Sequence, residues 1–134
     1  MVGGILQRVE EALDESFALD GVLGVALGDW RNGTCLRSKF RTNVTGFSQC
    51  ELELIVSGNA ELIRNKTKQF SRTQEKLEEL FLVYEQFFCV VRLVNTITGL
   101  FFCLVLERQK ANLAHARLKF SQITSAIELP EVEG

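Results

Sequence analysis

Cysteine and histidine are the side chains of this sequence whose types best suit metal binding or nucleophilic catalysis. The chain contains Cys35, Cys50, Cys89, Cys103 and a single histidine, His115. A zinc site needs four nitrogen or sulfur ligands, usually with two of them only roughly three residues apart. No two of these cysteines are that close. We therefore expect no metal site and interpret the four cysteines as small hydrophobic residues in a reduced core.

The sequence also lacks recognisable motifs for acid–base catalysis and for phosphate binding. The sequence has no GxxxxGK[ST] loop, no GxSxG elbow and no GxGxxG turn. Glu78 and Glu79 are adjacent on an expected strand and so point to opposite faces. Glu51 and Glu53 are two residues apart on an expected helix, where side chains diverge. We predict that the chain is not an enzyme and binds no cofactor.

The composition is that of one ordinary globular domain. The chain has 134 residues, of which 46% are hydrophobic and 24% charged. A chain of this length can bury a sizeable hydrophobic core. We predict a single domain over residues 1 to 134, with an ordered core at about 5 to 127 and an acidic tail from 128 to 134. The net charge of −2 argues against a nucleic-acid partner, because such proteins carry a basic excess.

We recognise neither the pattern of a signal peptide nor that of a membrane-spanning segment in the sequence. The first residues show no charged segment followed by an apolar core. The longest uncharged run, residues 93 to 106, is interrupted by polar residues and is shorter than the roughly 20 apolar residues that cross a bilayer. We expect a cytoplasmic protein without membrane insertion.

Hydrophobic periodicity defines the elements of the first half of the chain. Residues 5 to 17 carry apolar side chains at helical spacing, and residues 21 to 30 form a short run that is apolar on both faces, as in a central strand. Asn32-Gly33 then predicts a tight hairpin. In the returning strand, residues 34 to 40, basic side chains occupy alternate positions, which suits a strand at an outer edge of the sheet.

A capping signal marks the second helix. Ser48 followed by Glu51 forms a capping box, and Phe47 with Leu52 suits a hydrophobic staple, so a helix should run from residue 48 to about residue 70. Gly58 lies near its middle, where glycine costs about 1 kcal/mol relative to alanine. The position therefore suggests a close packing contact, for example with another helix.

The second half predicts three strands and a last helix. Residues 77 to 94 are too long for one strand, so we place a hairpin at Glu85-Gln86 between strands 78–84 and 87–94. A central strand at 100–106 and a helix at 109–127 follow. The resulting fold class is α+β, in the order α-β-β-α-β-β-β-α: a five-stranded antiparallel sheet with helices on both faces.

This order, together with two stretches of residues, resembles the Roadblock family of dynein light chains and GTPase-associated proteins. LFFCLVLERQKANLAHAR at positions 100 to 117 is similar to the strand-to-helix segment of bacterial members, and VLGVAL at positions 22 to 27 is similar to their first strand. Glu107 stands where the family usually has Asp, and His115 replaces an apolar residue. The likeness extends over residues 5 to 127 by the order of elements.

The resemblance implies a Roadblock/profilin-like homodimer. In the family the third strand pairs with its copy, and the second helices meet over that seam. Carried onto this chain, the expected interface residues are Leu54, Gly58, Leu62, Leu80 and Leu82. The alternative is an interior third strand, with Gly58 packed on its own sheet.

The sequence is compatible with three functions. The resemblance implies a non-catalytic adaptor or regulator in signalling whose dimer binds a small Ras-like GTPase. The first alternative is a small-molecule-sensing domain of the profilin-like or GAF-like kind, which would need a cavity. Phe87, Phe88, Phe101, Phe102 and Phe120 argue instead for a filled core. The second alternative is a structural subunit of a larger complex.

Overall fold

The computed structural model describes residues 2 to 44 and 46 to 128, and it has the element order expected from the sequence. A short 3₁₀ helix, η1, follows the last helix and includes Glu128, the first residue of the expected acidic tail; residues 129 to 134 of that tail lie outside the described residues. The elements are α1 (Val2–Phe17), β1 (Val22–Asp29), β2 (Thr34–Phe40), α2 (Gln49–Gln69), β3 (Glu79–Val83), β4 (Phe87–Leu93), β5 (Leu100–Glu107), α3 (Leu113–Ser125) and η1 (Ala126–Glu128).

The five strands form one antiparallel sheet in the order β2-β1-β5-β4-β3. β1 and β5 lie in its centre, and nearly every residue of both strands is buried. This confirms the reading of both strands as apolar on both faces. β2 and β3 are the two edges of the sheet.

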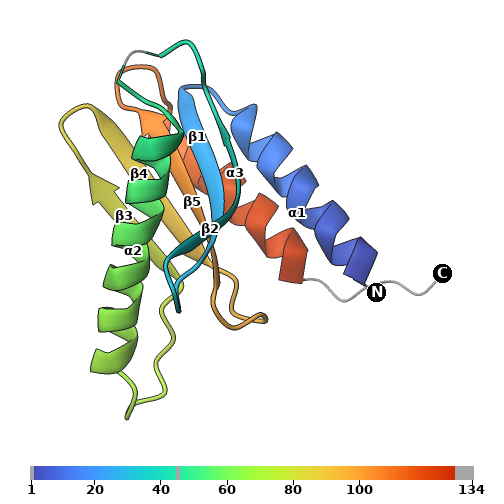
Figure 1. Ribbon diagram of the computed structural model, residues 1–134, viewed down its shortest axis with the longest axis vertical. Helices are drawn as coiled ribbons and strands as arrows, with labels where there is room; N and C mark the ends of the chain where they lie inside the picture. The colour runs from blue at the N-terminus through green and yellow to red at the C-terminus, as the bar shows by residue number, and fades with distance from the viewer. Residues whose placement is uncertain (1, 45, 129–134) are drawn as a thin grey trace.

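Helices cover the two faces unequally (Figure 1). α1 and α3 contact each other on one face, over a core that includes Leu13, Phe102 and Phe120. α2 lies on the other face, chiefly over β1 and β2, above a core that includes Val56 and Phe101. Both cores extend across the central strands, so the sheet is the middle layer of three.

Local signals explain how most elements begin. Ser48 is the N-cap of α2, and its backbone N–H donates to Glu51 Oε2 at 2.8 Å, which confirms the capping box. The β1–β2 hairpin is present, but its loop has four residues because Asp29 pairs with Thr34. In this loop only Gly33 takes a positive φ, +77°.

The edge strand β2 is joined to α1 by ion pairs. Arg37 Nε lies 3.4 Å from Glu10 Oε1, and Lys39 Nζ contacts Asp14 Oδ1. These exposed pairs stabilise only modestly. They place charged side chains along β2, as suits an edge that must not pair with other chains.

The last helix begins later than expected. The sequence pattern predicted a helix from residue 109, but α3 starts at Leu113, because Asn112 is its N-cap and its Oδ1 accepts from the His115 N–H. Leu118, on this helix, is 57% exposed. His115 is exposed.

The cysteine expectation is correct for two of the four residues. Cys89 and Cys103 are buried in the core under α2, and all four cysteines are free. Cys50 is exposed on α2 and Cys35 only half-buried on the edge strand, so these two are not core residues. Within the described part of the chain, no helix is long and apolar enough to cross a membrane.

Candidate dimerisation surface

The outer edge of β3 is the free edge of the sheet on the side away from β2. Within residues 2–44 and 46–128, β3 pairs with β4 and with no strand on its other side. Leu80 and Leu82 belong to the face that carries α2, and both are only half-buried. Val83, at the end of the strand, is 55% exposed. An apolar edge of this kind is a template for pairing with another strand.

The outward side of α2 carries the other three expected residues. Leu54 is 67% exposed, Gly58 is exposed and Leu62 is half-buried. A Cβ atom placed on Gly58 would meet no atom within 4 Å. The interior alternative is therefore wrong for the single chain: β3 is an edge, and Gly58 does not pack on its own sheet.

The five expected residues divide into a row on α2 and a pair on the α2 side of β3. Leu54, Gly58 and Leu62 follow one another at intervals of four, the row that forms a packing ridge on a helix surface. Leu80 and Leu82 lie on the same side of the sheet as this helix. The five residues thus form one layer, α2 together with the α2 side of the free edge, which we call the edge–helix surface.

The opposite face of β3 is fixed by a charged cluster that the sequence did not predict. Glu79 accepts from Arg92 Nη1 on β4 at 2.9 Å and also from Arg117 on α3. Arg117 lies over the Phe81 ring, 4.9 Å from its centroid. Burial alone would raise the pKa of the Glu79 carboxyl, but the two arginines outweigh it and lower that pKa. The cluster ties the free edge to α3.

A buried amide holds the inward side of α2. Asn59 is 4% exposed, and its Nδ2 donates to Cys89 Sγ at 3.4 Å and to Cys103 Sγ at 3.5 Å. The two sulfur atoms lie 3.2 Å apart. The pKa of the Cys103 thiol is well above its ordinary value, because the contact with Cys89 and burial both disfavour a thiolate. We read this group as an anchor for α2 over β4 and β5.

No group of three or more potential metal ligands occurs among the described residues. The edge–helix surface offers apolar side chains, a free row of backbone donors and acceptors, and a glycine that leaves room for a second backbone. In proteins that do bind a partner through an open sheet edge, the bound segment pairs with that edge as an added strand.

Solved structures of other proteins share this architecture. The gliding protein MglB from Thermus thermophilus superimposes with a TM-score of 0.74 at 18% identity, covering 92% of this chain and 88% of that one. A structure of MglB with tetrameric arrangement gives a TM-score of 0.73 at 18% identity, with the same coverage. A Roadblock/LC7 domain from Streptomyces avermitilis gives 0.64 at 8% identity, covering 88% of this chain and 89% of that one.

The chain has the Roadblock fold. These structures share 18% sequence identity or less with the chain, so the likeness shows the fold and nothing further. The sequence matches no family model and no curated protein. Within the Roadblock fold of this chain, the expected interface residues Leu54, Gly58 and Leu62 lie on the outward side of α2, and Leu80 and Leu82 lie on the edge strand.

Proposed function

We propose that this chain is a non-catalytic regulatory adaptor that works as a homodimer. Two copies pair through β3 to make one continuous sheet, and their α2 helices pack over the seam. The observation that carries the proposal is the edge–helix surface: an unpaired apolar edge strand and, on the same layer, a helix side with Leu54 at 67% exposure and open space at Gly58.

Symmetry supports this arrangement over an open chain of copies. Antiparallel pairing of β3 with its own copy is a two-fold operation, so the same residues serve both partners and the contact closes on itself. The same operation brings the two α2 ridges face to face, where Gly58 lets the backbones approach. The description of an MglB structure as a tetrameric arrangement agrees with a fold that associates with copies of itself.

The partner of the dimer is, in this proposal, a small Ras-like GTPase. The paired sheet with two adjacent helices is a wide platform, and binding to it would bias the GTPase between its conformations. The support is the resemblance of the strand-to-helix segment at positions 100 to 117 to that of GTPase-associated Roadblock proteins, together with the shared fold. No residue of this chain is assigned a role in GTP hydrolysis.

Binding to GTPases from the same genome tests the partner. Each small Ras-like GTPase encoded there is purified, loaded with GDP or with a non-hydrolysable GTP analogue, and titrated against this protein. We expect one of them to bind in a nucleotide-dependent manner, and to bind Gly58→Arg at least about tenfold more weakly. If none binds in either state while the protein is dimeric, the GTPase part of the proposal is wrong and the dimer serves a larger complex.

A further inference from the structure

A pocket of about 570 Å³ lies at one end of the sheet. It is enclosed by the C-terminal end of α2, the loop after it, the β4–β5 connection and the residue that follows β1. None of the five edge–helix residues lines it. Its lining is chiefly apolar and includes Trp30, Phe70, Leu77, Leu93, Ile97 and Leu100.

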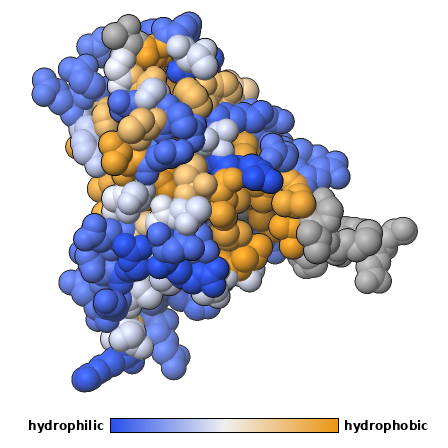
Figure 2. Space-filling model, viewed as in Figure 1, coloured by the Kyte–Doolittle hydropathy of each residue, from blue (hydrophilic) through white to orange (hydrophobic). Residues whose placement is uncertain are grey.

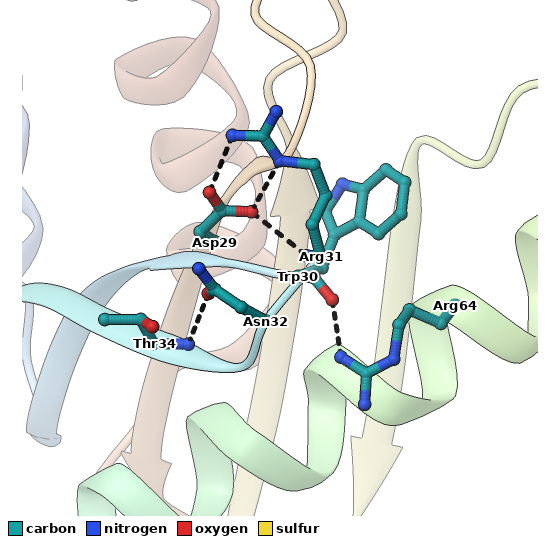
Figure 3. Close-up of polar contacts among 6 residues, drawn as sticks. All are labelled: Asp29, Trp30, Arg31, Asn32, Thr34 and Arg64. Atoms are coloured by element: carbon teal, nitrogen blue, oxygen red, sulfur yellow. Dashed lines mark hydrogen bonds and ion pairs between the residues drawn. The ribbon is translucent and has the colours of Figure 1, made fainter.

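The backbone of Trp30 is held in place by hydrogen bonds. Its N–H donates to the Gly99 carbonyl at 2.8 Å, and its carbonyl accepts from Arg64 Nη1 at 2.6 Å. Beside it, Arg31 Nη2 lies 2.8 Å from Asp29 Oδ2 and its Nε donates to Asp29 Oδ1 (Figure 3). The wall of the pocket is therefore anchored before any ligand arrives, which lowers the entropic cost of binding.

The chain segment beside the pocket is basic. Residues 64 to 76 carry five basic side chains and one acidic side chain, a net charge of +4 in a chain whose total is −2. Lys66, Lys76 and Glu75 line the pocket, and neither lysine has an ion-pair partner among the described residues. Figure 2 shows hydrophilic side chains massed over the C-terminal half of α2.

We propose that this pocket binds a short acidic segment of a partner protein, which inserts one large apolar side chain between Trp30 and Phe70. Acidic residues on both sides of that side chain face Lys66 and Lys76. The apolar lining supplies affinity for the inserted group, and the basic segment selects for acidic neighbours and speeds association.

The distribution of charge favours a peptide over other anionic ligands. The basic side chains extend over the last turns of α2 and the whole following loop, so a ligand needs several negative charges at separate points to meet them. A small carboxylate carries only one negative charge and does not meet this requirement. A membrane surface requires apolar side chains that protrude from the protein, whereas here they line a recess.

Trp30 is the single tryptophan of the chain, so its fluorescence reports on the pocket directly. The probes are synthetic seven-residue peptides with blocked ends: six glutamates around a central phenylalanine, the same peptide with a central alanine, and six lysines around a central phenylalanine. We expect saturable one-to-one binding of the first probe. The second should bind about tenfold more weakly, and the third should not bind.

Two pairs of variants locate the site. Lys66→Glu with Lys76→Glu should weaken binding of the glutamate–phenylalanine probe at least about tenfold, whereas Lys119→Glu, an exposed change on α3, should leave it unchanged. Phe70→Ala should weaken binding, whereas Leu118→Ala should not. Phe70 and Leu118 are 49% and 57% exposed, so both variants should fold. Trp30 fluorescence in urea checks folding of each.

Three results would overturn the proposal. The first is equal binding of the phenylalanine and alanine probes, which would mean that the pocket is not used. The second is binding to vesicles of phosphatidylglycerol but to no peptide, which would make this a lipid surface. The third is no binding to any probe. Light scattering on the same samples reports the dimer separately, so loss of the dimer and loss of peptide binding are distinguishable.

Discussion

Glu79 and Arg92 face each other as a register pair across β3 and β4, with 2.9 Å between Glu79 Oε2 and Arg92 Nη1. Each side chain is only 20% exposed, and Arg117 of α3 contacts the other carboxylate oxygen of Glu79. The ion pairs of Glu79 thus connect the free edge of the sheet to α3, on the face opposite α2. They hold the backbone of β3 in an extended form that is suitable for pairing.

Replacement of Glu79 by Gln should destabilise the folded chain by about 1 to 2 kcal/mol at pH 7, because two arginines lose their counter-charge in a half-buried setting. The pKa of Glu79 is lower in the folded chain than its ordinary value of 4.5. Its contribution is therefore present above pH 4.5 and is lost as the pH falls through the lowered folded pKa. Urea unfolding of both proteins between about pH 3 and pH 7, monitored through Trp30, measures the difference.

The matched control for this pair is Glu85→Gln, an exposed glutamate in the turn between β3 and β4. It should leave the free energy of unfolding unchanged within about 0.5 kcal/mol. A Glu79→Gln protein as stable as the wild type at pH 7, or a difference that grows as the pH falls, would contradict the assigned role of the cluster.

Gly99 should tolerate no side chain. Its φ is +94°, and an added Cβ would lie 2.5 Å from Arg31 Nε and 2.7 Å from Asp29 Oδ1. We expect Gly99→Ala to destabilise by about 2 to 4 kcal/mol through backbone strain and overpacking together. Gly46 separates the two causes, because its φ is +82° but no atom lies within 4 Å of its added Cβ. Gly46→Ala should cost about 1 kcal/mol, and equal losses for the two variants would show that Asp29 and Arg31 move aside.

Thiol reactivity should rank the cysteines by burial. Cys50 is exposed and should react first with maleimide, while Cys35 should follow more slowly because burial raises the pKa of its thiol. Cys89 and Cys103 are 0% exposed and should react only at the rate of unfolding. Mass spectrometry of tryptic peptides over time gives each rate. Early labelling of Cys89 would mean that α2 lifts from the sheet in the folded state.

Local signals made much of the fold predictable. The capping box at Ser48 and Glu51 fixed the start of α2, and the apolar runs identified both central strands. The start of α3 was wrong because the strand-to-helix connection contains turns that hydrophobic periodicity does not register, while Asn112 provides the cap.

Contacts distant in the sequence were not predictable. Glu79 meets Arg92 and Arg117, which are 13 and 38 residues away, and no pattern in one sequence links them. The pocket likewise joins Trp30, Phe70 and Ile97 from three separate segments. The expected interface residues came from the family likeness, and the fold gives their position in the single chain.

Gly58→Arg should separate the dimer without unfolding the chain. An arginine side chain would project into the space that the second α2 requires, while the helix itself should gain slightly, because glycine is the poorer helix former by about 1 kcal/mol. Urea unfolding and light scattering measure the two effects. Leu118→Arg, an exposed change on α3, is the control and should stay dimeric. A dimeric Gly58→Arg protein would remove α2 from the interface.

The solution mass of the unmodified protein tests the dimer most directly. Multi-angle light scattering over a dilution series should give twice the 15.1 kDa of the chain, constant until the dissociation range is reached. The free edge of β3 and the exposed ridge of α2 would then be accounted for by a second copy. A mass of 15.1 kDa at every concentration would contradict the homodimer, and with it the platform proposed to bind a GTPase.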